Sequence, residues 1–248
     1  MTTNIADVKR TAPLKNVVAF NSLVKKLINR EPDMPGIGVF YGRSGLGKTK
    51  SAIYGASTSR AVYLEVGQYT TARTLMRAIL IELGEQRPKG CVDEMISQAI
   101  FRLAADPSRP LIVDEAHWIA AKRFIDVLRE LHVKSRAPVI MIGEEMLPAN
   151  LEVYERVHNR ILDWVAAQPC DLDDTRTLAR AYCAGLQVRD DLLEEICTRV
   201  AGNTRRIVVN LARVVEEAKK AGRAAIGLAD YDVALISTHK APGPGGLK

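Results

Sequence analysis

The sequence has 248 residues, of which 47% are hydrophobic and 26% charged, and its formal net charge is +6. That balance is typical of a soluble globular protein, and the length allows one large domain or a core with a small appended domain. No apolar run reaches the roughly 20 residues of a membrane span, and the N-terminus lacks an apolar signal-peptide stretch. We therefore expect a cytoplasmic protein, and the positive charge favours a polyanionic partner without proving one.

The first third of the chain alternates helical and extended patterns. The polar residues 1–12 predict a flexible arm. Residues 21–30 place their apolar side chains on one helical face and predict a helix. Residues 37–41 (IGVFY) are a short apolar run that predicts a buried strand, and a glycine-rich turn leads from it to a helix over 50–57. Residues 61–66 (AVYLEV) predict a second strand.

The alternation continues through the middle of the chain. Apolar residues at helical spacing predict helices over 75–83, closed by a glycine, and over 92–103. A third strand is predicted at 111–113, a further helix over 124–131 and a fourth strand at 138–142. Strands that alternate with helices indicate an α/β fold with a parallel sheet covered by helices on both faces.

The C-terminal part has a different pattern. Residues 169–172 predict a fifth strand, and short helices without strands follow from about Asp173. We expect polar helix caps and closing glycines at Asp173, Asp190, Asn203, Gly185, Gly202 and Gly222. The predicted organisation is a flexible arm at 1–12, an α/β domain at 13–172, a small all-helical domain at 173–240 and a loose tail at 241–248.

The turn after the first strand matches a phosphate-binding motif. Its sequence, GRSGLGKT, fits the pattern G-x-x-x-x-G-K-[ST] in full. Glycines allow backbone N–H groups to point at phosphate oxygens, because no Cβ stands in the way. Lys48 is expected to reach the β- and γ-phosphates, and the Thr49 hydroxyl to bind Mg²⁺. We therefore predict that ATP and Mg²⁺ bind at Gly42, Ser44, Gly45, Gly47, Lys48, Thr49 and Lys50.

Two acids end the third predicted strand. Asp114 is expected to orient Mg²⁺ or its water, and Glu115 to act as the general base that polarises the attacking water. The strand at 61–66 comes between the phosphate motif and the acids, which leaves room for a sheet in which an extra strand separates the two. His117 contacts either the nucleotide site or a neighbouring subunit, or it is a cap or surface residue, and Trp118 is expected to pack in the core.

The cysteines give no metal pattern. Cys91, Cys170, Cys183 and Cys197 form no C-x-x-C pair, and no histidine lies at zinc spacing from them. We expect buried, reduced thiols.

Four motifs, GRSGLGKT, LIVDEAHW, RVHNR and GNTRR, together resemble those of AAA+ ATPases over roughly residues 14–236. Within that class, the lead NVVAFNSLVKKLINR, the DEAH stretch and the compact size most resemble the transposition regulators typified by the B protein of phage Mu, with TnsC and the IstB helpers as cousins. The resemblance implies a P-loop AAA+ sheet with a small helical lid. It also implies a homo-oligomer, either a ring or a helical filament, around double-stranded DNA.

The resemblance also implies roles for single residues. Asp114 and Glu115 match the Walker B pair, and Arg160 matches the arginine finger that reaches the γ-phosphate of the next subunit, with Arg156 as the alternate. Arg205 matches the sensor 2 arginine of the lid, a role that Arg206 takes in the alternative assignment.

The chain departs from the family pattern at two places. Gly143, Glu144 and Glu145 stand where these ATPases carry an Asn or Thr as sensor 1, so Glu144 substitutes for it or hydrolysis is slow. Only a short arm precedes the core, where the Mu B protein has a helix-turn-helix domain, so DNA binding is expected from the ATPase core itself.

Exposed polar residues after two strands are the predicted DNA contacts. The family places pore-facing residues after the second strand, and basic residues follow the acid strand on the same side of the sheet. Such groups contact phosphates without reading sequence. The predicted contacts are Tyr69, Thr70, Thr71, Arg73, Arg77, Lys122 and Arg123.

Three functions fit the sequence. The first is an ATPase that binds DNA largely without sequence preference, oligomerises on target DNA and recruits or activates a transposase, in the bacterial cytoplasm if a phage or transposon encodes it. The second is a nucleotide-dependent scaffold that barely hydrolyses ATP. The third is a helicase loader or replication-type ATPase.

Overall fold

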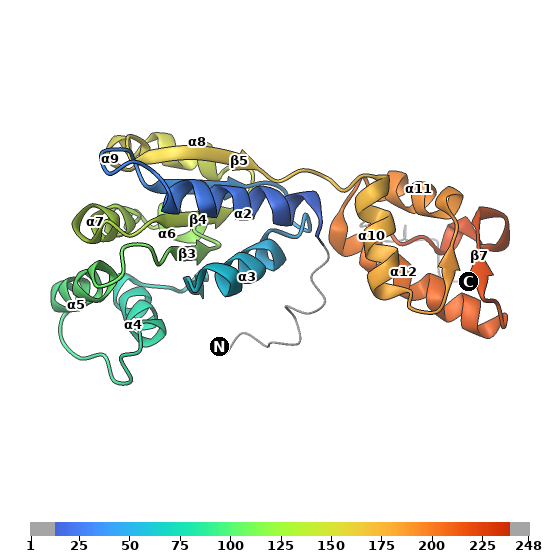
Figure 1. Cartoon of the computed structure of the whole chain (residues 1–248), viewed down its shortest axis with the longest axis horizontal. Coiled ribbons are helices and arrows are strands. Elements are labelled where there is room, and N and C mark those ends of the chain that lie inside the picture. The colour runs from blue at the N-terminus through green and yellow to red at the C-terminus, as the bar shows by residue number, and fades with distance from the viewer. Residues whose placement is uncertain (1–12, 239–248) are drawn as a thin grey trace. The chain divides into compact units, whose positions relative to one another are not determined.

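The computed structural model describes residues 13–238, which form two compact units (Figure 1). The first unit consists of Asn16–Ser44 and Lys48–Ala167, and the second of 13–15, Gly45–Gly47 and 168–238. Each unit has its own hydrophobic core. The arm predicted at 1–12 and the tail predicted at 241–248 lie outside the described residues.

The first unit is built on a five-stranded sheet. Its strands are β1 (Ile37–Tyr41), β2 (Val62–Glu65), β3 (Leu111–Asp114), β4 (Val139–Gly143) and β5 (Ile161–Ala166). The order is β2-β3-β4-β1-β5, and neighbouring strands are parallel. The predicted α/β fold with a parallel sheet is confirmed. The extra strand expected between the phosphate motif and the acids is β4.

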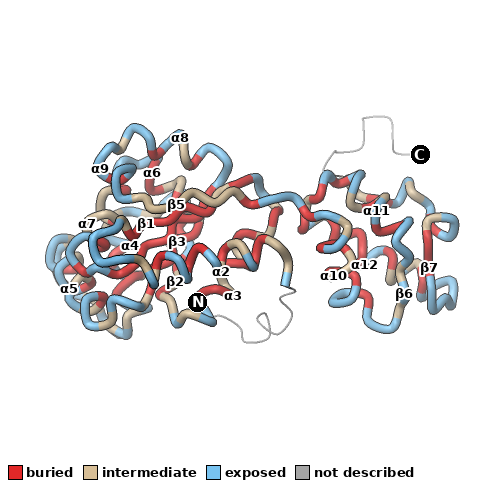
Figure 2. Tube along the Cα trace, turned by 45° about the horizontal axis from the view of Figure 1, so that its top comes forward, coloured by how far each residue is buried: buried red, intermediate tan, exposed pale blue. Residues whose placement is uncertain are grey.

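Apolar residues cover both faces of the sheet, because alternate side chains of a strand point to opposite sides. In β1, Ile37 and Val39 join the larger core, whereas Phe40 meets Phe20 in an edge-on contact with ring centroids 5.3 Å apart. Gly38 lies so close to the helix on that side that a Cβ would be 2.6 Å from Leu27. Figure 2 shows the central strands β1 and β3 as mainly buried within the first unit.

Helices pack on both faces. On one face lie α2 (Lys15–Ile28), which supplies Phe20, and α3 (Lys48–Ser59). The larger core includes side chains from α4 (Ala72–Glu82), α5 (Val92–Ala104), α6 (His117–Ala121), α7 (Asp126–Ser135), α8 (Leu147–Glu152) and α9 (Glu155–His158). The helix predicted over 124–131 corresponds to α7, and the short helix α6 precedes it, separated by a turn in which Arg123 adopts a left-handed φ of 61°.

The second unit is mainly helical. Its helices are α10 (Leu172–Tyr182), α11 (Asp190–Arg199) and α12 (Thr204–Lys220), with 3-10 turns η1 (Leu228–Asp230) and η2 (Val233–Leu235). A short parallel pair, β6 (Gln187–Val188) with β7 (Ala225–Ile226), means that the expectation of an all-helical unit was incomplete. Buried leucines, isoleucines and valines of the three helices form the core.

The strand predicted at 169–172 does not form. The Asp171 side chain instead accepts the main-chain N–H of Asp174 at 2.9 Å and caps α10, which begins at Leu172. Aspartate is a preferred N-cap because its carboxylate satisfies a free helix N–H. The fifth strand is β5, whose residues are all only partly buried.

Candidate nucleotide site

The phosphate motif forms the turn between β1 and α3. Gly45 and Gly47 have φ values of 85° and 83°, a left-handed conformation that glycine adopts without strain. Helix α3 begins at Lys48, so the N-terminal end of a 12-residue helix follows the turn. A helix N-terminus attracts anions through its free N–H groups and its dipole. The local geometry therefore suits a phosphate group.

Lys48 is buried at the start of α3. Its Nζ donates hydrogen bonds to the carbonyl oxygens of Gly42 (2.6 Å) and Arg43 (2.9 Å), which hold the ammonium at the turn. Its charge also lowers the pKa of Glu115. The predicted lysine and the predicted carboxylates therefore lie within electrostatic range of one another. Thr49 is partly buried, and Ser44 and Lys50 are exposed.

Asp114 ends β3 and is 1% exposed. Its Oδ1 accepts the main-chain N–H of Glu115 at 2.9 Å, and its Oδ2 accepts the hydroxyl of Tyr63 at 3.2 Å. Tyr63 lies in β2, the neighbouring strand, and burial together with the Asp114 charge raises its pKa, so the hydroxyl stays protonated. The sequence analysis did not identify Tyr63 as a site residue, because nothing local to position 63 marks it.

Glu115 turns away from the strand direction with a φ of 58°. A left-handed conformation is unfavourable for a non-glycine residue, by about 1–3 kcal/mol, and such residues cluster at functional sites. Burial raises the pKa of Glu115 above its ordinary value, and the adjacent Asp114 carboxylate raises it further. A carboxylate of raised pKa is a stronger base, which suits the role predicted for Glu115.

Two further residues stand close to Glu115. His117 Nδ1 lies 3.2 Å from Glu115 Oε2 but makes no hydrogen bond of acceptable geometry. Among the roles left open for His117, the structure shows a contact with the candidate base. Glu144 follows β4 and is exposed, and its charge contributes to the raised pKa of Glu115. Trp118 packs against the core, as predicted.

Arg160 lies at the other end of the sheet. It directly precedes β5, and its carbonyl oxygen accepts the N–H of Ile37, the first residue of β1. The phosphate turn follows the last residue of β1, so Arg160 and the turn of the same chain are separated by the length of that strand. Arg156 lies in α9, and its charge adds to the larger effect of the Arg129 hydrogen bond in lowering the pKa of Asp126. Both arginines are exposed.

The arginine predicted as sensor 2 lies in the second unit. Arg205 is in the first turn of α12, and its side chain is exposed. Its main-chain N–H donates to the carbonyl oxygen of Gly45 at 3.0 Å, and both residues belong to that unit. Arg206 is partly buried, and its N–H is capped by Asn203.

The residues predicted to contact DNA fall on exposed segments. Tyr69 is 88% exposed, and Thr71 caps α4. Arg73 and Arg77 are exposed on α4. Lys122 reaches this segment from the loop after α6, because its Nζ donates to the carbonyl oxygen of Thr70 at 3.0 Å. Arg123 is exposed beside it in the chain.

The cysteines are free thiols, and not all of them are buried. Cys170 and Cys183 are buried, which raises the pKa of each to about 11. Cys91 is exposed and Cys197 partly buried, so the expectation of four buried thiols is wrong for these two. Within residues 13–238 there is no group of three or more His, Cys, Asp or Glu side chains suited to a metal, and no helix there is long and apolar enough to cross a membrane.

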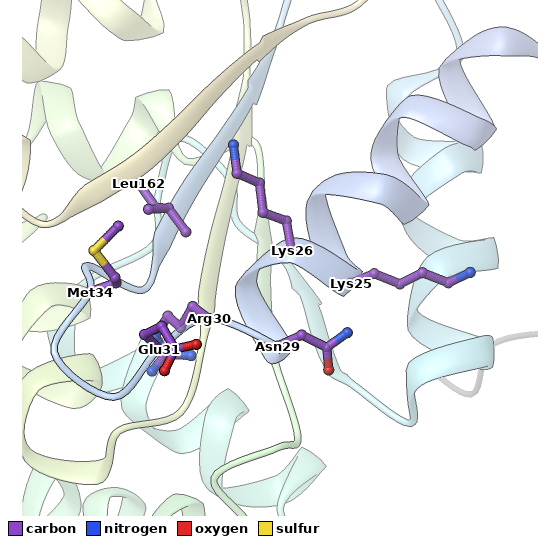
Figure 3. A pocket seen from close by; sticks show the side chains of 7 residues that line it. All are labelled: Lys25, Lys26, Asn29, Arg30, Glu31, Met34 and Leu162. Carbon is purple, nitrogen blue, oxygen red and sulfur yellow. The ribbon is translucent and has the colours of Figure 1, made fainter.

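A groove of about 350 Å³ lies away from the phosphate turn (Figure 3). Leu162 of β5 and Met34 line it together with Lys25, Lys26, Asn29, Arg30 and Glu31. Leu162 is the extra residue at a register shift between β1 and β5, because Ile37 pairs with Ile161 and Gly38 with Asp163. None of the predicted nucleotide residues contributes to this groove.

The residues at the phosphate turn fit a nucleoside triphosphate with Mg²⁺. Backbone N–H groups and Lys48 suit phosphate oxygens, and Thr49 and Asp114 offer the hard oxygen ligands that Mg²⁺ prefers. Asp114 accepts one described hydrogen bond on each oxygen, and a carboxylate has about four acceptor positions. Acceptor capacity therefore remains for a metal ion or its water.

One family model matches the region that contains the candidate site residues 42–50, 114 and 115. Residues 31–151, just under half of the chain, match the family described as the AAA domain, whose members in general hydrolyse nucleotides. No curated protein matches the sequence.

Two solved structures resemble the fold. The Orc1 protein of Aeropyrum pernix, determined in complex with DNA, has a TM-score of 0.62 and 18% sequence identity, over 85% of this chain and 61% of that chain. Cdc6p from Pyrobaculum aerophilum has a TM-score of 0.60 and 19% identity, over 85% of this chain and 62% of that one. At these identities the likeness concerns the fold. The narrower resemblance to Mu B-type transposition regulators stays a prediction.

Proposed function

We propose that the protein is an ATPase that uses ATP to assemble on double-stranded DNA, largely without sequence preference. The observation that carries the proposal is the convergence at one end of the sheet. Lys48 lies within electrostatic range of Glu115, and Asp114 sits beside Glu115. Together with the phosphate turn, these are the groups that ATP hydrolysis needs.

Each residue has a part in the proposed reaction, in which ATP and water give ADP and phosphate. Lys48 exchanges its carbonyl partners in the turn for the β- and γ-phosphate oxygens. Thr49 and Asp114 would hold Mg²⁺, which would supply positive charge against the charge that develops on the phosphates. Glu115 accepts a proton from the attacking water.

Arg160 acts on a neighbouring copy in this proposal. Because it stands at the opposite end of the sheet from the phosphate turn of its own chain, it serves as an arginine finger only in trans. A guanidinium suits this role because it is always charged and offers several donors to phosphate oxygens. The protein therefore works as a homo-oligomer, a ring or a helical filament. Arg205 is the proposed sensor 2 residue of the helical unit.

The exposed segment after β2 is the proposed DNA surface. It contains Tyr69 and the arginines of α4, with Lys122 bonded to its backbone. The net charge of +6 and the Orc1 structure determined with DNA support a DNA partner. Phosphate contacts weaken steeply with salt, by about 0.9 log unit in affinity per log unit of salt for each phosphate.

The fold likeness to Orc1 and Cdc6p favours a helicase-loader or replication-type role. A role in transposition is the second candidate, and the motifs GRSGLGKT and LIVDEAHW with the lead before them support it. Glu144 is exposed and stands where sensor 1 is expected. Its position supports a third candidate function, a nucleotide-dependent scaffold that barely hydrolyses ATP.

ATP turnover and DNA binding of the purified protein test the proposal together. DNA is expected to raise turnover, and ATP to be required for stable DNA binding. The double variant Arg73→Gln/Arg77→Gln is expected to reduce the slope of log affinity against log salt concentration by the amount that about two phosphate contacts contribute. Arg87→Gln, in the loop after α4, is the control and is expected to leave the slope unchanged. DNA binding that is equal with and without ATP contradicts the proposed switch.

A second experiment identifies the protein partner, by adding a helicase or a transposase to the protein assembled on DNA. Loading of a hexameric helicase onto DNA supports the replication-type role, and stimulation of strand transfer by a transposase supports the second. Turnover that is undetectable with DNA, and is the same in Glu115→Gln, supports the scaffold instead.

A further inference from the structure

Tyr63 makes the one side-chain contact that the described residues show to the candidate metal carboxylate. It is partly buried in β2, and its hydroxyl donates to Asp114 Oδ2 at 3.2 Å. Tyr63 belongs neither to the phosphate motif nor to the acid pair. The hydroxyl lies beside the carboxylate that is expected to hold the metal or its water.

Asp114 depends on such a donor because it is almost completely buried. A buried carboxylate is costly unless hydrogen bonds satisfy it. Asp114 Oδ1 accepts the main-chain N–H of Glu115, and Asp114 Oδ2 accepts the hydroxyl of Tyr63 from the neighbouring strand. The two donors stand on different oxygens, so together they fix the rotation of the carboxylate as well as its position.

The sheet register explains why a tyrosine is needed at this position. Glu65 of β2 pairs with Asp114 of β3, and Tyr63 pairs with Ile112. Tyr63 is therefore two residues, about 6.6 Å, upstream of the position level with the carboxylate. A phenol is long enough to span that offset along the sheet, whereas a serine or threonine hydroxyl at the same position is not.

We propose that Tyr63 is a positioning residue for the magnesium site, and that its hydroxyl holds the Asp114 carboxylate in the orientation that receives the metal or its water. This inference rests on the proposed function. Groups that orient a metal ligand contribute strongly to metal binding, and their loss costs about 10- to 100-fold in metal affinity or activity.

The test must separate metal positioning from a purely structural role of the hydrogen bond. Tyr63→Phe removes the hydroxyl and keeps the ring. Tyr154→Phe is a matched control, because Tyr154 is also partly buried and its hydroxyl donates to a carbonyl oxygen, that of Ala120, at 2.8 Å. The control loses a hydrogen bond of similar kind that does not touch Asp114.

The direct measurement uses Mn²⁺ as the probe, followed by electron paramagnetic resonance with the full-length protein and a non-hydrolysable ATP analogue. Tyr63→Phe is expected to weaken Mn²⁺ affinity about 10-fold. Nucleotide affinity without metal and the melting temperature are expected to match those of Tyr154→Phe. The Mg²⁺ concentration for half-maximal ATP turnover is expected to rise by a similar factor.

A double-mutant cycle with Asp114→Asn shows whether Tyr63 acts through Asp114. Adding Tyr63→Phe to Asp114→Asn is expected to change Mn²⁺ affinity less than twofold, because coupled residues are not additive. Independent, additive losses overturn the proposal, and so does a Tyr63→Phe protein with the Mn²⁺ affinity of the control. A wild-type protein that binds no nucleotide contradicts the proposed function itself, which is a different result.

Discussion

The two ends of the parallel sheet carry opposite kinds of chemistry. At the carboxyl end, a buried lysine stands within range of two acids, so opposite charges compensate one another. At the amino end, the guanidinium of Arg30 donates to the carbonyl oxygen of Arg136, and that of Arg136 donates to the carbonyl of Pro32. Those carbonyls orient the arginines without neutralising them, and Arg160 is near enough to His132 for its charge to contribute, after burial, to the lowered pKa of that ring.

The difference follows from the length of the strands. Five residues at about 3.3 Å each separate the ends by roughly 17 Å, which is too far for one residue to act at both. Under the proposed function, the carboxyl end forms the nucleotide site, whereas the amino end acts on phosphates only if another copy brings them. Catalysis would then be divided between copies, and the predictions below test groups at the two ends of the sheet.

Loss of the proposed base is expected to have the largest effect. Glu115→Gln keeps the size of the side chain but removes the proton acceptor, so turnover is expected to fall by about 10²- to 10⁴-fold. Nucleotide affinity is expected to stay within threefold, and assemblies on DNA to persist after ATP addition. Phosphate release and nucleotide titration measure these outcomes. Glu152→Gln, exposed at the end of α8, is the control, and an equal loss of turnover in that variant would contradict the role of Glu115 as the base.

Loss of the phosphate lysine comes next. Lys48→Ala removes a buried charge next to the phosphates, and truncating one member of a buried charge pair costs about 2–5 kcal/mol, which is roughly 30-fold or more in affinity. Titration with a fluorescent ATP analogue measures the loss. Lys89→Ala, exposed in the loop between α4 and α5, is the control and is expected to change affinity less than threefold. Normal assembly of Lys48→Ala on DNA would contradict the ATP switch.

The division between copies is tested by mixing variants. Arg160→Ala is expected to lower turnover about 10-fold or more with unchanged nucleotide affinity, because its own phosphate site is intact. Mixed with Glu115→Gln, it is expected to regain part of the activity, since the second variant supplies the arginine. A mixture no more active than its parts would show that the two ends do not cooperate between copies. Arg156→Ala tests the alternate finger in the same way.

The smallest expected effect concerns stability at the amino end. His132 is buried and its Nδ1 bonds with the carbonyl oxygen of Ala137, and burial lowers its pKa, as do the charges of Arg30, Arg160 and Arg136. The folded state therefore disfavours the protonated ring. The stability from neutral His132 is fully present above the unfolded pKa of about 6.5 and is lost as pH falls below it. His132→Asn keeps a donor for the carbonyl oxygen of Ala137. Its melting temperature is expected to fall less between pH 7 and pH 5 than that of the wild-type protein.

The fold was predictable where apolar patterns are local. The runs at β1, β3 and β4 appear in the sequence almost as they stand in the sheet. Strand β5 was missed because it lies at the sheet edge, its residues are half-exposed, and Asp163 interrupts the apolar run while pairing with Lys26. The break between α6 and α7 was missed because it depends on the left-handed backbone of Arg123, which its residue type does not favour.

The residues of the candidate site also fall into two groups, those that the sequence marks and those that only the structure reveals. The sequence by itself determined the phosphate turn and the acid pair, because a glycine-rich turn, a lysine and a strand ending in two acids act through consecutive residues. Only the tertiary structure decided that Tyr63 bonds to Asp114, which lies 51 positions away, that His117 stands beside Glu115, and that Arg160 lies at the opposite end of the sheet from its own phosphate turn. These contacts depend on strand order and register, which arise from packing of the whole sheet and leave no mark at any single position.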